Sequence, residues 1–202
     1  GAVFPFENFQ GPLFVPVSTE QYFNGQRKEN NTYFYNNAVI HKQGLGFRGF
    51  DKITTYDNIR GRTMTQEYDP FYYGILKSEE SPWLKNTNTY SVTIQSNKIL
   101  RITMSSHSSL DKLKNITTTS TYQYDAYGNP TNESISYGGG ISGTVTRTYS
   151  NNTSETGYML GFLYDMTKTT NRNGSTWSER MFIPVYSSGS PIVKIQYSNG
   201  NQ

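Results

Sequence analysis

Alternation of side-chain type with a period of two runs through most of this sequence, and a helical period is hard to find in it. In RTMTQEYD, at 62–69, Met64 and Tyr68 fall on one face of an extended chain and the threonines on the other. NTYSVTIQ, at 88–95, alternates in the same way, with Tyr, Val and Ile on one face. Successive side chains of a strand point to opposite faces, so this pattern predicts strands.

Short runs of turn-forming residues separate the predicted strands. Asn-Gly between two β runs is a strong hairpin signal. Because such connections are too short for a crossover, we expect neighbouring strands to be antiparallel. The stretch Leu110–Asn115 could form a short helix and could equally be a loop. The predicted turns fall at Gly128–Pro130, Gly138–Gly140, Asn173–Gly174, Ser188–Gly189 and Asn199–Gly200.

The sequence therefore predicts an all-β protein, a long antiparallel meander of consecutive hairpins with roughly a dozen strands. A sheet of this length has to curl to bury its apolar face and protect its edges, so we expect it to be strongly curved or partly closed. We expect residues 1–42, which are rich in Phe and Pro, to pack on the sheet. Residues 43–113 and 114–202 are two further regions of hairpins, and all three are expected to form one continuous β domain.

Composition narrows the classes of function. Aromatic residues make up 15% of the chain and the net charge is only +3, which favours a folded chain over a disordered one. Lys and Arg form no cluster in the sequence, and a clustered basic face is what nucleic-acid binding usually requires, so we expect no nucleic-acid partner. The absence of cysteine excludes disulfides and Cys-ligated zinc. No apolar run is long enough to span a membrane. Gly1, in place of an initiator Met, is interpreted as a residue left after tag removal from a chain whose natural leader or upstream region was deleted.

The stretch TYQYDAYGNP, at 121–130, is the most informative in the chain, and each of its residue types has a role in a tight corner. Tyr124 ends a strand and buries its ring while its hydroxyl keeps a polar partner. Asp125 accepts hydrogen bonds from the turn's own backbone. Gly128 supplies a positive φ, which Asn129 also tolerates. Pro130 begins the next strand.

Two later stretches repeat this pattern in a degenerate form. They are YSSGSP from Tyr186 and YSNGN from Tyr197, and each has Tyr, a short spacer, Gly and a small polar residue. Self-similar elements of this kind are typical of repeat architectures.

The corner resembles the YD repeat of the RHS family, whose pattern is Tyr-Asp, a short spacer and Gly-Asn, and YQYDAYGNPT carries it here. The run GLGFRGFDKITTYDNIRGRTMTQEYDPFYYGILKSEES, at 44–81, is similar to the stretch that leads into YD repeats in bacterial RHS proteins and in the related SpvB-like and toxin-complex B proteins. The likeness is closest to Bacteroides-type RHS-repeat proteins and covers residues from Gln43 to the C-terminus.

This resemblance implies a strip of hairpins that winds into a shell, secreted or at the surface of a bacterial cell. In toxin-bearing members the shell encloses a C-terminal toxic polypeptide. The expected partners are therefore the remainder of a longer chain or such an enclosed polypeptide. The chain lacks the family's core motif near the end of the shell and any toxin domain after it, so we expect an excised segment or a short member.

No pattern in the chain points to catalysis. His41 and His107 are not in a metal-ligand spacing, and no Gly-x-Ser-x-Gly elbow occurs. Glu79 and Glu80 are adjacent and would face opposite sides of a strand. Asp57 and Asp69 are interpreted as turn residues. We therefore expect no enzyme activity, no cofactor and no metal site.

Exposed aromatic side chains offer the alternative function, a carbohydrate-binding or adhesin-like surface module. Trp83 and Trp177 could stack on sugar rings, with Tyr72 and Tyr73 as neighbours, or each could pack on the sheet. The leading hypothesis remains a non-catalytic structural segment of an RHS/YD-repeat shell.

Overall fold

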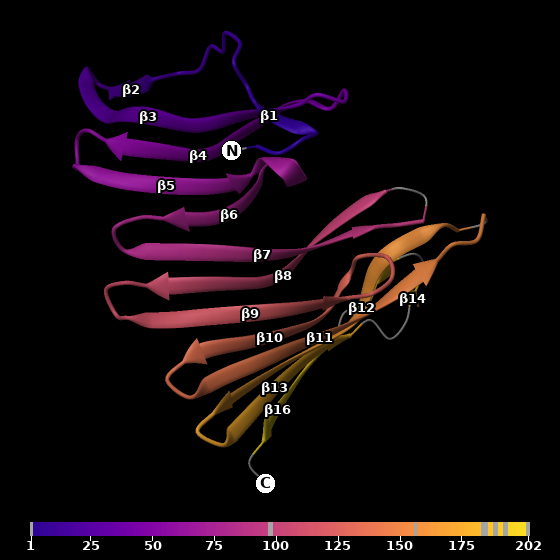
Figure 1. Ribbon diagram of the computed structural model, residues 1–202. Coiled ribbons are helices and arrows are strands. Elements are labelled where there is room, and N and C mark those ends of the chain that lie inside the picture. The colour runs from indigo at the N-terminus through magenta and orange to yellow at the C-terminus, as the bar shows by residue number, and fades with distance from the viewer. Residues whose placement is uncertain are drawn as a thin grey trace. The chain divides into compact units, whose positions relative to one another are not determined.

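The computed structural model describes residues 2–96, 99–155 and 157–182, together with the backbone of 186–187, 190–191 and 194–200. The prediction of an all-β protein built as an antiparallel meander is confirmed (Figure 1). The strands are β1 (Phe6–Asn8), β2 (Ser18–Phe23), β3 (Gln26–His41), β4 (Gly46–Asp57), β5 (Arg62–Asp69), β6 (Ile75–Glu80), β7 (Leu84–Ile94), β8 (Leu100–Asp111), β9 (Ile116–Tyr124), β10 (Pro130–Gly138), β11 (Ile141–Asn152), β12 (Met159–Arg172), β13 (Ser175–Phe182), β14 (Tyr186–Ser187), β15 (Ser190–Pro191) and β16 (Lys194–Gly200).

Strand order follows chain order almost throughout. Each strand from β3 to β13 is hydrogen-bonded to the next one along the chain, β13 pairs with β16, and β1 and β2 both pair with β3. Contacts divide the chain into two compact units: Gly1–Asn88 with Ser109–Asn115, and Thr89–Ser108 with Ile116–Gln202.

The first unit is organised around the long strand β3. Residues 1–42 supply β1, β2 and β3 itself, and β1 and β2 pair with opposite ends of β3. A row of aromatic rings joins β3 and β4: the ring centroids of Tyr35 and Phe50 lie 4.8 Å apart, and those of Phe50 and Phe47 lie 5.7 Å apart. Phe9 packs edge-on against Phe47, whereas Phe4 is exposed.

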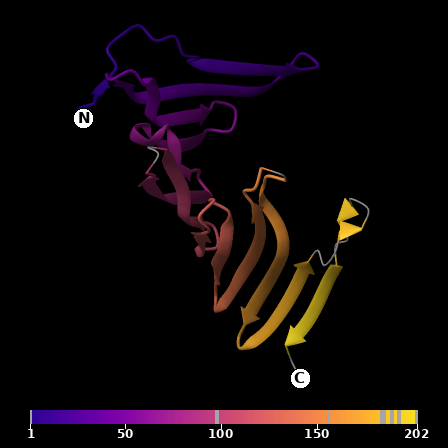
Figure 2. The ribbon, with the colours of Figure 1, turned by 90° about the vertical axis from the view of Figure 1, so that its right-hand side faces the viewer.

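The second unit is a series of hairpins, which Figure 2 shows from the side. At the predicted turn Asn173–Gly174 both residues have positive φ, as a two-residue hairpin loop requires. The predicted turn at Gly138–Gly140 also joins two strands, β10 and β11. The predicted turn at Asn199–Gly200 is wrong, because both residues pair with β13 inside β16. Ser188–Gly189 lies outside the described residues.

Two local elements differ from the expectations or were not expected. Leu110–Asn115 forms no helix: β8 continues to Asp111 and a tight loop follows, so the loop alternative holds. A 3-10 turn, η1 (Pro70–Tyr72), was not foreseen. The side chain of Asp69 caps it by accepting a hydrogen bond from the Phe71 amide.

Burial is shallow in both units. Among the described residues the buried apolar side chains are Val39 and Pro70 in the first unit and Val145 in the second, and the two valines are 4% and 6% exposed. The accessible surface is 13575 Å². Two separate compact proteins of half the chain's mass would together expose only about 11,600 Å². Large apolar side chains therefore remain uncovered on the sheet.

Candidate functional site

The loop between β9 and β10 is held together by one carboxylate. Asp125 Oδ1 accepts hydrogen bonds from the amides of Tyr127 and Asn129, both at 2.9 Å. The Gly128 amide donates to the Asp125 carbonyl at 3.1 Å, and Gly128 has φ +91°. Tyr124 and Pro130 pair across the two strands, so the five residues from the sequence motif form a closed corner.

A second set of hydrogen bonds joins this corner to the next hairpin. Asp125 Oδ2 accepts from the side-chain amides of Asn129 at 2.9 Å and of Asn151, in β11, at 3.2 Å. Asn151 Oδ1 in turn accepts from the Gly161 amide, in β12, at 2.8 Å. The corner thus ties together four consecutive strands, β9 to β12.

The same contacts set the charge state of Asp125. Burial alone would raise the pKa of this carboxyl, but hydrogen bonds from the Asn129 side chain and amide, the Tyr127 amide and the Asn151 side chain outweigh it and lower the pKa. Asp125 therefore acts as a fixed anion that organises the loop.

Three tyrosines make a recurring contact with an earlier part of the chain. Tyr124 Oη donates to the Met104 carbonyl at 2.7 Å, and Tyr149 Oη donates to the Pro130 carbonyl at 3.1 Å. In the first unit, Tyr35 Oη donates to the Pro16 carbonyl at 2.9 Å. The donor and acceptor lie 20, 19 and 19 residues apart, respectively. We call these contacts the tyrosine clamps; burial raises the pKa of all three hydroxyls.

Two further corners use an aspartate in nearly the same way. Asp57 Oδ1 accepts from the second and third amides that follow it, both at 3.0 Å, and so does Asp111 Oδ1. Each aspartate is followed four positions later by a residue with positive φ, Gly61 or Asn115. The interpretation of Asp57 as a turn residue is confirmed. The Asp111 corner was missed, although its Asp-x-x-x-Asn spacing was a usable signal.

The two tryptophans belong to different units and have different surroundings. Trp83 is partly exposed, and the guanidinium of Arg62 lies 4.3 Å above its ring, so one face of the indole is already occupied. Trp177 is also partly exposed and lies in β13, opposite Thr170 of β12.

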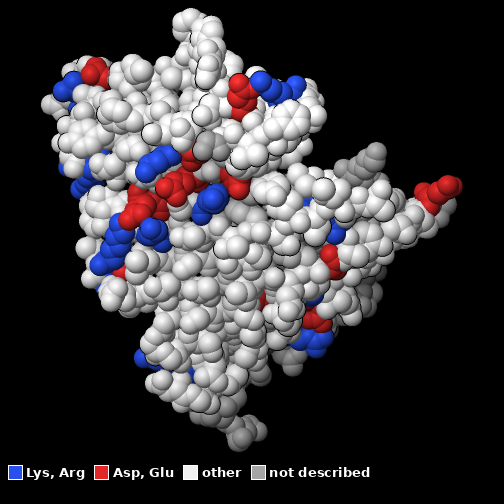
Figure 3. All heavy atoms as spheres, viewed as in Figure 1, with Lys and Arg blue, Asp and Glu red and all other residues white. Residues whose placement is uncertain are grey.

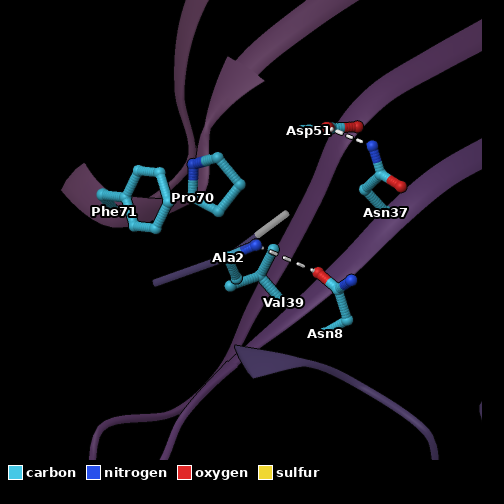
Figure 4. Close-up of a pocket in the computed structure, with 7 residues that line it drawn as sticks. All are labelled: Ala2, Asn8, Asn37, Val39, Asp51, Pro70 and Phe71. Carbon is cyan, nitrogen blue, oxygen red and sulfur yellow. Dashed lines mark hydrogen bonds between the residues drawn. The ribbon is translucent and has the colours of Figure 1, made fainter. Parts of the chain in front are cut away.

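A small pocket in the first unit is lined in part by Asp51 (Figure 4). The Asn37 side chain donates to Asp51 Oδ2 at 2.6 Å, whereas Asp51 Oδ1 is buried without a hydrogen-bond partner. Asn37 has φ +47°. The pocket has a volume of about 150 Å³. Its lining residues are Ala2, Asn8, Asn37, Val39, Asp51, Pro70 and Phe71.

A larger pocket, also in the first unit, lies beside Arg48. Arg48 is 9% exposed, yet its contacts are with neutral groups. Nε donates to the Pro70 carbonyl at 3.2 Å and Nη2 to the Phe71 carbonyl at 3.4 Å, while the guanidinium carbon lies 4.0 Å from the centre of the Tyr73 ring. The pocket has a volume of about 380 Å³ and is lined by Arg48, Gly49, Phe50, Ile53, Tyr68, Tyr73 and Gly74.

Several other titratable side chains in the described residues have structural contacts. Glu80 bridges Lys85 and Lys112 at 3.0 and 2.8 Å, and its neighbour Glu79 accepts from Gln66. On the face drawn in Figure 3, acidic and basic side chains lie interspersed. In the part of the chain that the structure describes, no three His, Asp or Glu side chains are grouped as a metal site would require.

Comparisons with known proteins give no match, either to a protein-family model or to a curated protein. Among the described residues, no helix has the length and apolar character needed to cross a membrane.

Proposed function

We propose that this chain is a non-catalytic structural segment of a shell built from consecutive β-hairpins, of the kind that RHS/YD-repeat proteins form, in a bacterial protein that is secreted or displayed at the cell surface. Its partners would be the remainder of a longer chain or a polypeptide enclosed by the shell.

The observation that carries the proposal is the shallow burial of the sheet. With Val39, Pro70 and Val145 as the buried apolar side chains of the described residues, each unit leaves much apolar surface in water. Burial of that surface is worth about 25 cal/mol per Å². A segment of this kind gains most of its stability when neighbouring hairpins or an enclosed chain cover its faces.

The links between hairpins give further support. The Asp125 network joins four consecutive strands, and each tyrosine clamp spans 19 or 20 residues of chain. These contacts hold each ribbon to the one before it, which is what a wall made of repeated hairpins needs. In this proposal the carboxylates and phenols organise loops and are not reactive groups.

The test is to express the complete open reading frame that contains this sequence. The proposal predicts additional Tyr-Asp and Gly-Asn corners beside the segment, and a polypeptide from the same gene that co-purifies with it after mild proteolysis. A reading frame without further hairpins, whose product is a stable monomer that does not bind an apolar dye, contradicts the proposal.

Glycan binding is a second proposed function, and it is compatible with the first. The observation that favours it is aromatic exposure: Trp83 and Trp177 are partly exposed, and Tyr73 is 60% exposed beside an open pocket. Glycan-array binding that disappears in Trp83→Ala or Trp177→Ala would support binding at these indoles. Unchanged binding in both variants would exclude the two indoles as the site.

A further inference from the structure

Arg48 lies at an irregularity of β4 that turns it out of the regular sheet register. Val39 of β3 pairs with Gly49, and the next residue, Ile40, pairs with Phe47, so Arg48 is the extra residue of a β-bulge. Bulges re-aim a side chain relative to its neighbours on the strand. Here the bulge places the guanidinium against the carbonyls of η1 and the Tyr73 ring.

The charge of Arg48 is buried without an anion beside it. In the described part of the chain no carboxylate forms an ion pair with Arg48, and Nη1 makes no hydrogen bond to a protein atom. Arg147, which is less deeply buried, is paired with Glu133 at 3.0 Å. Removal of a charge from water is costly unless an opposite charge or a full set of acceptors compensates it. The Arg48 site therefore has capacity for an anionic group.

The pocket beside Arg48 suits a ligand that has an anionic group and a ring with apolar C–H surface. No Asp or Glu lines it, and Asp51 lines the two neighbouring pockets instead. Tyr73 has one ring face against Arg48 and is largely exposed, so it offers aromatic surface to a ligand. Tyr68 also lines the pocket. The volume of about 380 Å³ accommodates a single sugar ring.

We propose that this pocket binds the carboxylate of an acidic sugar, a uronic acid unit, with Arg48 as the charge partner and the exposed edge of the Tyr73 ring as the apolar contact. A guanidinium presents donors in a planar fork that matches a carboxylate better than an ammonium does. The C–H groups of a sugar ring pack against an aromatic side chain, whereas an acidic peptide side chain needs the charge partner alone. The proposal rests on glycan binding as the second proposed function and adds a location and a ligand class to it.

The probe is a short oligogalacturonate, titrated into the whole chain while binding is measured by calorimetry and by NMR shifts. Its methyl ester is the matched ligand, because it keeps the ring and removes the charge. We expect the acid to bind at least about tenfold more tightly than the ester, since charge-assisted hydrogen bonds to Arg are lost in the ester. Equal binding of acid and ester overturns the proposal, and so does the absence of binding at millimolar concentration.

Tyr73→Asn is the principal protein variant, because Asn tolerates the positive φ of 65° at this position and the carbonyl contacts of Arg48 remain. Tyr72→Asn is its control, since Tyr72 is partly exposed and does not line the pocket. The proposal predicts a loss of at least about fivefold in affinity for the first variant and no change for the second. Equal affinities of the two variants overturn it.

Arg48→Lys tests whether the planar donor geometry of the guanidinium matters beyond its positive charge. If the variant remains folded by circular dichroism, uronate affinity falls about tenfold although the positive charge is kept. Two further outcomes test the ligand class and the location of the site. A hexaglutamate peptide that binds as tightly as the uronate overturns the sugar assignment. Glycan binding that is lost in Trp177→Ala and intact in Tyr73→Asn overturns the pocket while leaving glycan binding in place.

Discussion

The side-chain amide of Asn151 donates to the carboxylate of Asp125 at 3.2 Å, across 26 residues of chain. This contact turns the β9–β10 corner from a local turn into a link between successive hairpins. Because Asn151 also accepts from the Gly161 amide, one side chain connects both hairpins through its two polar ends.

Replacement of this amide tests the link directly. We expect Asn151→Ala to lower the free energy of unfolding by about 1–3 kcal/mol, because Asp125 and the Gly161 amide both lose a partner in a half-buried site. The measurement is urea denaturation followed by tyrosine fluorescence. Asn152→Ala is the control, since the Asn152 side chain accepts a hydrogen bond from the exposed Ser154 amide and does not contact Asp125 in the described part of the chain. Equal destabilisation by the two substitutions would refute the role assigned to Asn151.

Because Asp125 is ionised in the folded protein, we expect its contribution to the free energy of unfolding to depend on pH. Its folded-state pKa lies below the ordinary value of 3.8, so its ionisation stabilises the fold above that value and the contribution is lost as the pH falls through the lowered folded-state pKa. Asp125→Asn keeps the shape but directs an amide at the donors of Asn129 and Asn151. We expect the variant to be less stable at pH 7 by about 1.5–3 kcal/mol, because hydrogen bonds to a charged group are lost.

The difference in stability between wild type and Asp125→Asn should shrink as the pH is lowered below about 4. Unfolding curves of both proteins at a series of pH values give this difference, and other carboxylates such as Asp57 cancel between them. A difference that stays constant down to the acid limit would show that the charge of Asp125 is irrelevant to folding.

The tyrosine clamps predict a cost for the loss of a hydroxyl alone. Tyr124→Phe and Tyr149→Phe keep the ring and leave the carbonyls of Met104 and Pro130 without their donors. Each should cost about 0.5–1.5 kcal/mol of unfolding free energy. Tyr127→Phe, in the exposed part of the same corner, should change stability by less than about 0.5 kcal/mol. The measurement is thermal unfolding of the three variants. A loss of stability in Tyr127→Phe equal to that in Tyr124→Phe would argue against the tyrosine clamp.

Replacement of Gly161 by Ala should destabilise the fold both by backbone strain and by a steric clash. It has φ +72°, and a Cβ at this position would lie 2.8 Å from Asn129 Oδ1. Gly174 has φ +85° and open space around it, so Gly174→Ala measures the cost of the positive φ alone, about 1–2 kcal/mol. We expect Gly161→Ala to cost clearly more in chemical denaturation. Equal costs would mean that the Asn129 side chain moves aside freely.

The sequence predicted the features that depend on neighbours in the chain. Alternation placed the strands, and the Asn173–Gly174 turn follows from two residues that tolerate positive φ. The same reasoning failed at Asn199–Gly200, because pairing with β13 determines the conformation there and turn-forming residue types do not prevent it.

Features that depend on distant partners were not predictable in this way. Asn151 and Gly161 were not singled out, since their role depends on Asp125, which is remote in sequence. Arg48 was overlooked for a related reason: the one-residue shift between β3 and β4 that re-aims it leaves no local pattern. Asp111 was the exception, because its spacing to Asn115 matches that of Asp57 to Gly61 and could have been recognised.

The measurement that tests the central claim most directly is hydrogen–deuterium exchange of this segment, alone and within the product of its complete open reading frame. If the segment is one part of a larger shell, the backbone amides of β3 to β13 should exchange at least about tenfold more slowly in the full product, because covering the sheet faces raises the free energy of local opening. Identical exchange rates in the two contexts would contradict the account, since they would show that the sheet is as stable uncovered as it is in its natural chain.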